Sequence, residues 1–173
     1  DFGAGSSPVI EGDWVILCQD HDQGSFLMAL DKRTGEPIWR VDRSEFSRNY
    51  CTPVIWEVGG KKRIIVAATL RVVGYDFETG KELWTYDPQV PREWGRYACC
   101  DAVNRGVALW GDALYFATLD GRLISLDART GKQRWEINTI DRTKPYTITG
   151  APRVIKGKVL IGNGGGEYGG DGR

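Results

Sequence analysis

One short pattern occurs three times in this chain and constrains its fold more than any other feature. Each copy has the core Asp-x-x-Thr-Gly, followed by Trp four residues after the Gly. The copies begin at Asp31, Asp76 and Asp127, so that 45 and 51 residues separate them. Repeats of this length are typical of solenoids and propellers, and four strands per repeat fit one blade of a β-propeller.

The residue types in the repeat predict its local structure. Asp and Thr side chains hydrogen-bond their own backbone and start a tight turn, and Gly adopts the positive φ that the turn needs. An apolar run precedes each turn and a short run ending in Trp follows it, so each turn joins two antiparallel strands. Further strand pairs around Gly-containing turns are predicted at 8–17, 108–116 and 154–160. Because no long segment has the 3.6-residue period of a helix, the chain is predicted to be all-β.

The repeats predict β-propeller blades over 1–173, about three to four in number. The repeat units are approximately 5–50, 51–103, 104–150 and an incomplete 151–173. The recurring Trp39, Trp84 and Trp135 are expected to cover a sheet face and pack against the neighbouring blade. A closed propeller typically has four to eight blades, so the chain is expected to be a segment of a longer protein. Its open edges predict self-association.

Composition argues against several functions. The chain has 23 basic and 23 acidic residues, which gives no electrostatic argument for binding nucleic acid. His21 is the single histidine, so a His-based metal site or catalytic triad is not expected. The longest apolar stretches have the length of strands, and no membrane span is expected.

The adjacent residues Cys99 and Cys100 allow two interpretations. They could form a strained disulfide, a rigid feature of the kind found where a ligand is held, or they could be two unrelated buried thiols. The pair lies in the longer repeat interval, and loops that depart from a repeat often carry function. Cys18 and Cys51 are interpreted as small buried hydrophobes, and whether they pair is left open.

The repeats resemble the eight-bladed propeller of pyrroloquinoline-quinone (PQQ) proteins, in which this unit is the tryptophan-docking motif. Residues 81–167 resemble a quinoprotein alcohol dehydrogenase in particular. The matching pieces are 86–91, 96–108, 118–123, 138–141, 146–152 and 162–169. Residues 1–80 resemble the broader class of PQQ-like repeat proteins, many of which bind no quinone. Tyr50 lies where the dehydrogenases have a Glu that contacts PQQ.

The resemblance implies a set of cofactor-binding residues. Cys99 and Cys100 would form a disulfide against one face of PQQ, Arg105 would pair with the quinone, and Thr149 would contact a PQQ carboxylate. Backbone amides at Gly165 and Gly166 would approach the cofactor, and Glu167 would bind Ca²⁺. A guanidinium fork, a glycine run and a carboxylate suit these roles chemically. The alternatives are a surface ion pair for the Arg, a plain loop for the glycines and a solvated turn residue for the Glu.

The same resemblance implies part of a periplasmic quinoprotein alcohol dehydrogenase, which oxidises primary alcohols to aldehydes with PQQ and calcium and passes electrons to a cytochrome c. The catalytic base is expected on blades that follow this segment, so no catalytic residue is assigned here and the isolated chain is expected to be inactive. The alternative is a non-catalytic propeller scaffold for protein interactions, which would neither bind PQQ nor respond to calcium. The alcohol, and whether the first half comes from another subfamily, are not determined.

Overall fold

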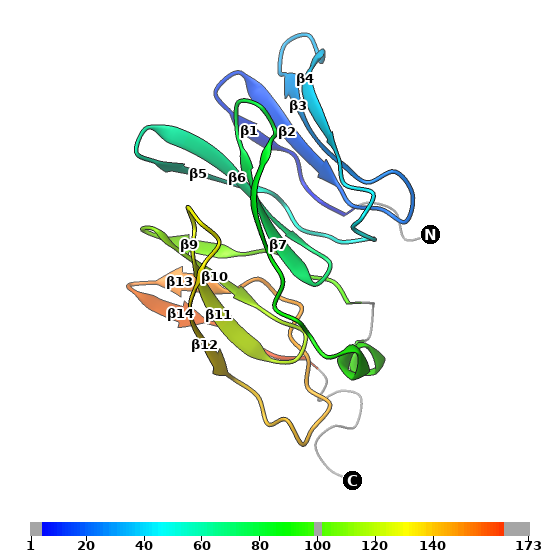
Figure 1. The fold of residues 1–173 in the computed structure, drawn as a ribbon, viewed down its shortest axis with the longest axis vertical. Helices are drawn as coiled ribbons and strands as arrows, with labels where there is room; N and C mark the ends of the chain where they lie inside the picture. Colours follow the sequence, from blue (N-terminus) through cyan, green and yellow to red (C-terminus); the bar gives the residue numbers. More distant parts are fainter. Residues whose placement is uncertain (1–4, 99–101, 165–173) are drawn as a thin grey trace.

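The computed structural model describes residues 5–98 and 102–164, and these residues form a row of antiparallel sheets in chain order (Figure 1). The first sheet contains β1 (Val9–Glu11), β2 (Trp14–Gln19), β3 (Phe26–Asp31) and β4 (Pro37–Asp42). The second contains β5 (Val54–Val58), β6 (Lys61–Ala68), β7 (Arg71–Asp76) and β8 (Glu82–Tyr86). The third contains β9 (Ala108–Trp110), β10 (Ala113–Ala117), β11 (Arg122–Asp127) and β12 (Gln133–Asn138), and β13 (Arg153–Ile155) pairs with β14 (Lys158–Leu160).

Within each sheet every strand pairs with the next strand along the chain, which is the meander expected of a propeller blade. The prediction of an all-β propeller segment with three to four blades is therefore confirmed. We number the blades 1 to 4 in chain order.

The repeated turn has the structure that its residue types predict. In blade 1 the Asp31 carboxylate accepts hydrogen bonds from the backbone N–H groups of Thr34 and Arg33, at 2.9 and 2.8 Å. These bonds lower the pKa of Asp31. Gly35 closes the turn with φ +75° and donates its N–H to the Asp31 carbonyl at 2.9 Å. The bond from the Thr N–H to the Asp carboxylate and the bond from the Gly N–H to the Asp carbonyl recur in blades 2 and 3.

A β-bulge precedes this turn in all three complete blades. The register shifts between Ala29 and Leu30, between Gly74 and Tyr75, and between Ser125 and Leu126. A bulge places an extra residue on one strand and increases the local twist. Its recurrence makes it part of the repeat, although the alternation of residues in the sequence does not predict it.

Tryptophan packing joins one blade to the next. Trp39 of blade 1 donates its Nε1–H to the Phe77 carbonyl of blade 2 at 3.1 Å. A Cβ on Gly80 would lie 2.6 Å from the Trp39 ring, so only glycine fits there. Trp84 packs against the corresponding glycine of blade 3, which confirms the prediction for these two residues. Trp135 leaves 42% of its surface exposed, so the expected packing is not made within the described residues.

The hydrophobic core continues through the three complete blades. Ile16 and Leu27 contribute from blade 1, and Leu114 and Ile124 from blade 3. In blade 2 the five consecutive residues 64–68 of β6 are all fully buried. Both faces of this central sheet are covered by neighbouring blades, so its strand is apolar throughout instead of alternating.

The loops of the blades separate into two ends. The β1–β2 and β3–β4 turns meet at one end, where the N–H of Lys32 donates to the Asp13 carbonyl at 2.9 Å. We call the opposite end the connector end. It holds the loops between β2 and β3, β6 and β7, and β10 and β11, together with the connecting segments 43–53, 87–107 and 139–152. The 3₁₀ helix η1 (Arg92–Tyr97), which was not predicted, lies in the second of these segments (Figure 1).

Candidate cofactor-binding site

The predicted site residues that the structure describes lie at the connector end. Arg105 is in the segment between blades 2 and 3, and Thr149 is in the segment between blades 3 and 4. The other predicted residues lie outside the described residues: Cys99, Cys100, Gly165, Gly166 and Glu167. Their roles remain predictions.

The structure brings Arg105 and Thr149 together from two different segments. The backbone N–H of Arg105 donates to the Thr149 carbonyl at 2.9 Å. The Arg105 guanidinium also donates, through Nη1, to the Thr149 hydroxyl. A backbone bond and a side-chain bond therefore both join Arg105 to Thr149, and together they orient the Arg105 side chain.

Among the described residues, Arg105 has no partner on its other side. Its side chain is exposed, and within residues 5–98 and 102–164 no carboxylate lies within ion-pair distance of it. By contrast, the nearby Arg122 is bound to the carboxylates of Asp120 and Glu136, at 2.9 and 3.3 Å. The surface ion pair considered as the alternative for Arg105 is thus not made by the described residues. A fixed guanidinium with free N–H groups suits a planar ligand that carries carboxylates.

The start of the glycine run lies beside the same segment. Gly164 donates its N–H to the Thr147 carbonyl at 2.8 Å, and the Thr147 N–H donates back to the Gly164 carbonyl at 3.1 Å. Thr147 is two residues before Thr149, and Gly165 follows Gly164 directly in the sequence. Gly164, the residue before the predicted cofactor contacts of Gly165 and Gly166, is therefore bonded to the segment that carries Thr149.

Gly106 supports the turn of the chain after Arg105. Its φ is +142°, a conformation that residues with a Cβ rarely adopt. A Cβ placed there would lie 3.4 Å from the Cβ of Ala151 and 4.0 Å from the Cys51 sulfur. The backbone that carries Arg105 thus packs closely against the first and third connecting segments.

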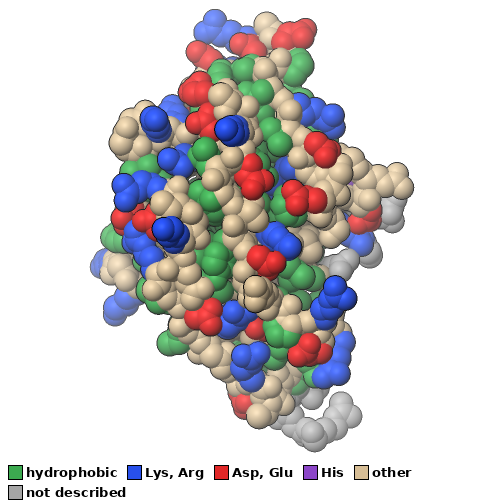
Figure 2. All heavy atoms as spheres, viewed as in Figure 1, with side chains coloured by type: hydrophobic (Ala, Val, Ile, Leu, Met, Phe, Trp, Pro, Cys, Tyr) green, Lys and Arg blue, Asp and Glu red, His purple; other side chains and the backbone are tan. Residues whose placement is uncertain are grey.

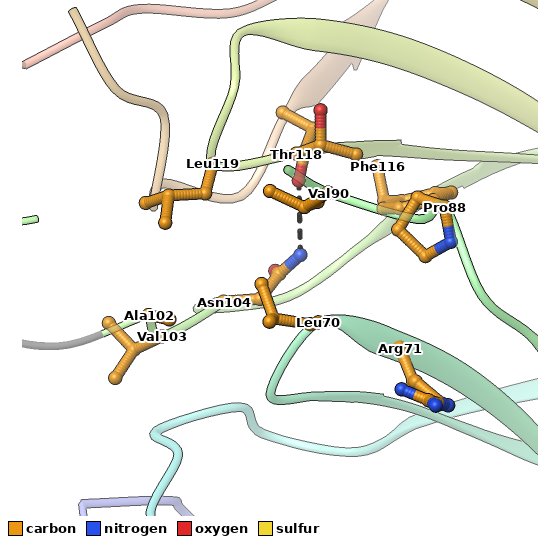
Figure 3. A pocket seen from close by; sticks show the side chains of 11 residues that line it. Leu70, Arg71, Pro88, Val90, Ala102, Val103, Asn104, Phe116, Thr118 and Leu119 are labelled. Carbon is orange, nitrogen blue, oxygen red and sulfur yellow. Dashed lines mark hydrogen bonds between the residues drawn. The ribbon is translucent and has the colours of Figure 1, made fainter. Parts of the chain in front are cut away.

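A small cavity lies under the second connecting segment (Figure 3). It is lined by Val103 and Asn104, by Leu119 and Phe116 of blade 3, and by Leu70 of blade 2. Its volume of about 10 Å³ is enough for roughly one water molecule. A tricyclic quinone does not fit in this cavity.

The connector end also contains a buried polar cluster that sequence reasoning missed. The Arg43 guanidinium donates through Nε and Nη2 to both oxygens of Asp20, each at 2.7 Å, and through Nη1 to the Tyr75 hydroxyl. Burial opposes the charge on Arg43, but the hydrogen bonds that Arg43 donates to Asp20, followed by the charges of its neighbours, outweigh burial and raise the pKa of Arg43. The alternation of residues in β2 and β7 gives no signal for such a cluster.

Cys18 and Cys51 are both free and buried, so the question whether they pair is answered. The Cys18 thiol lies 3.7 Å from an Asp20 oxygen. Burial raises the pKa of Cys18, and it raises the pKa of Cys51 to about 12. These thiols act as the small buried groups that the sequence predicted.

In the described part of the chain, neither the arrangement of metal-ligating side chains nor the distribution of charge indicates a further binding site. Residues 5–98 and 102–164 contain no group of three or more His, Cys, Asp or Glu side chains that could hold a metal ion. Basic and acidic side chains are interspersed on the face shown in Figure 2. Over the same residues no helix has the length and hydrophobicity needed to span a bilayer.

Comparison with known proteins assigns the family. A family model described as outer membrane protein assembly factor BamB matches residues 1–169. The chain belongs to this family.

Several relatives are quinoprotein dehydrogenases, which confirms the resemblance. The chain is 67% identical over 99 residues to quinohemoprotein alcohol dehydrogenase ADH IIB from Pseudomonas putida, covering 57% of this chain and 14% of that protein. It is 55% identical over 134 residues to 1-butanol dehydrogenase (cytochrome c) from Thauera butanivorans, covering 76% of this chain and 19% of that protein. The crystal structure of quinohemoprotein alcohol dehydrogenase from Comamonas testosteroni matches 68% of this chain and 17% of that one, with 53% identity and a TM-score of 0.61.

The chain therefore spans less than a quarter of the length of these relatives. It matches a short segment of each of these larger proteins.

Proposed function

We propose that this chain is part of a periplasmic, PQQ-dependent alcohol dehydrogenase and that its connector end forms one side of the quinone site. The observation that supports this most strongly is the pairing of Arg105 with Thr149, the two described residues for which the dehydrogenase resemblance implied contacts with the cofactor. They come from two different connecting segments, and the propeller fold brings them together. The identity to quinohemoprotein alcohol dehydrogenases supports the same function.

The described residues fit PQQ, which is flat and carries three carboxylates. The Thr149 hydroxyl holds one side of the Arg105 guanidinium, and no carboxylate in the described residues neutralises the other side. Arg105 would bind and orient an anionic group of the cofactor through a charge-assisted hydrogen bond, and Thr149 would restrict the direction of that bond. Cys99 and Cys100 would support one face of the ring system.

When bound, PQQ together with Ca²⁺ would supply the oxidant and the Lewis acid for removing two electrons and two protons from a primary alcohol, leaving an aldehyde. Glu167 would provide one calcium ligand, with the backbone at Gly165 and Gly166 alongside it. The catalytic base and the remaining calcium ligands would come from other blades of an eight-bladed ring. A cytochrome c would accept the electrons, in keeping with the name of the Thauera butanivorans relative.

Titration of the full-length protein with PQQ in the presence of Ca²⁺, followed by quenching of tryptophan fluorescence, tests this proposal. We expect Arg105→Ala to weaken PQQ binding by about tenfold or more, because a hydrogen bond to a charged group is lost. Glu167→Ala should remove the calcium dependence, and the double variant Cys99→Ser/Cys100→Ser should also weaken binding.

Arg33→Ala provides a matched control, because Arg33 is an exposed arginine in the β3–β4 turn at the opposite end of blade 1. It should bind PQQ like the unmodified protein. A well-folded protein that binds no PQQ, or equal binding by the Arg105 and Arg33 variants, would contradict the proposal. The first result would favour the scaffold function suggested by the name of the matching family model.

A further inference from the structure

Asn49 is a buried residue of the first connecting segment whose side chain is fixed from both sides. Only 2% of its surface is exposed. Its Nδ2 donates to the Ala67 carbonyl at the end of β6, at 2.5 Å. Its Oδ1 accepts the backbone N–H of Asn104, in the second connecting segment, at 2.7 Å. Because the amide nitrogen faces a carbonyl and the amide oxygen faces an N–H, both contacts support the same orientation of the side chain.

Asn104 extends this contact to blade 3 and to the residue that follows Arg105. Its Nδ2 donates to the Ala117 carbonyl at 3.1 Å, the bond drawn in Figure 3. Its Oδ1 accepts the N–H of Gly106 at 2.9 Å. The backbone on both sides of Arg105 is therefore held by one pair of asparagines, while Thr149 holds Arg105 itself.

We propose that Asn49 is a positioning residue for Arg105 and acts through Asn104. It ties the segment that carries Arg105 to blade 2, and so it fixes where the guanidinium stands relative to a bound anionic cofactor. The inference rests on the proposed function, because positioning matters only if Arg105 binds the quinone. It adds a residue from the first 80 positions, where the sequence resembles the general repeat class, to a site whose other residues all follow position 98.

A loss of this contact has two separable consequences. Without the Asn49 side chain, the partly buried N–H of Asn104 loses its acceptor, and residues 102–106 are no longer held to blade 2. The amides of this segment then exchange with solvent more readily, since exchange reports local opening. Arg105 also samples more positions, so its contribution to cofactor binding falls.

Hydrogen exchange measured by mass spectrometry on the full-length protein without PQQ tests the contact directly. We expect Asn49→Leu to increase exchange in peptides covering 102–106 by about tenfold, the equivalent of one lost buried hydrogen bond. Exchange in β10 and β11 should stay unchanged. Asn49→Asp keeps the shape of the side chain but places a carboxylate oxygen against the Ala67 carbonyl, so the tie to blade 2 is lost and exchange in 102–106 should increase here too. Should the Leu variant fail to fold, Asn49→Asp decides the result, because unchanged protection of 102–106 there would overturn the inference.

PQQ affinity with Ca²⁺ then tests the role of the contact. We expect Asn49→Leu to weaken binding by about tenfold, and we expect it to have no further effect when Arg105 is already Ala, because coupled residues are not additive. Asn138→Leu is the control, since Asn138 is an exposed asparagine at the end of β12 whose side chain donates to the Ile140 carbonyl at 2.9 Å. It should leave affinity unchanged.

The outcomes separate the inference from the proposed function. If the unmodified protein binds no PQQ, the proposed function fails whatever the exchange data show, and the positioning role fails with it. If it binds PQQ and Asn49→Leu binds equally well, the inference alone is wrong. Additive losses for Asn49→Leu and Arg105→Ala would likewise overturn the inference, because Asn49 would then act independently of Arg105.

Discussion

Two arginines at the connector end have the same side chain and opposite surroundings. Arg43 is completely buried, and both oxygens of Asp20, the Tyr75 hydroxyl and the ring of Phe46, 4.5 Å from its guanidinium carbon, surround it. Arg105 is exposed, and Thr149 binds it on one side. Arg43 follows β4 directly, Arg105 lies in the segment between blades 2 and 3, and neither position is distinguished by the hydrophobic pattern.

The difference shows how one residue type serves two purposes. Arg43 is buried and donates to Asp20 and Tyr75, so it joins blade 1 to blade 2 and is closed to a ligand. Among residues 5–98 and 102–164 the Arg105 guanidinium donates to Thr149 alone, which supports the proposal that it binds an anion. Removing one partner of a buried ion pair strongly destabilises the fold, whereas an exposed arginine contributes little to stability. The following predictions test this contrast.

The largest expected effect is on stability, from the removal of Asp20. Asp20→Ala leaves the buried charge of Arg43 without its partner, and we expect the free energy of unfolding to fall by about 3–5 kcal/mol. Arg105→Ala should change it by less than about 0.5 kcal/mol, because the side chain is exposed. Urea denaturation of the full-length protein, followed by circular dichroism, gives both values. Equal losses in the two variants would remove the distinction between the arginines.

Alkaline pH should lower the free energy of unfolding through the buried thiols and the buried tyrosine. The pKa of Cys51 is raised by burial to about 12, whereas its ordinary value is 9.0. Between these values the folded protein keeps the proton and the unfolded chain releases it, so stability falls as pH rises. At pH 10.5 the loss from Cys51 alone is roughly 2 kcal/mol. Cys18 and Tyr75, whose pKa values burial also raises, act in the same direction.

The measurement is the free energy of unfolding from pH 8 to 11 for the unmodified protein and for Cys51→Ala. The variant should start less stable, because a buried group is lost, but its stability should fall less steeply with pH. Parallel curves for the two proteins would show that Cys51 does not titrate differently in the folded and unfolded states.

A small effect on stability is expected from Thr149→Val. Valine keeps the shape of threonine but cannot accept the hydrogen bond from the Arg105 guanidinium, and the backbone bond between the two residues remains. We expect the free energy of unfolding to change by less than about 1 kcal/mol. PQQ affinity should fall severalfold, because Arg105 is no longer held in one direction, and fluorescence titration measures this loss. A large loss of stability with unchanged affinity would reverse the roles assigned to this residue.

The fold could be predicted because the turn in each repeat is specified by residues close together in the sequence. Asp31, Thr34 and Gly35 specify a turn through bonds made within five residues, and the same types recur in the next two copies. Because Trp39 and its counterparts recur four residues after the glycine of each turn, they could be predicted to pack against the neighbouring blade. The bulge before each turn was missed, because it depends on how the twisted strands pair and leaves no mark in the alternation of residues.

The candidate site was predicted only in part. The resemblance pointed to Arg105 and Thr149, and the structure brings them together from separate segments. The Asp20–Arg43–Tyr75 cluster and the pair Asn49–Asn104 were not predicted as contacts, since their members lie far apart in the sequence and belong to no motif.

The sequence by itself determined the all-β repeat, the turn chemistry and the tryptophans that join blades 1, 2 and 3. Those features arise from hydrogen bonds within a few residues or from one spacing that recurs. Only the tertiary structure decided which arginine is enclosed and which is open to a ligand. That distinction depends on whether a carboxylate from another strand or loop reaches the guanidinium, and only the stacking of successive blades determines this.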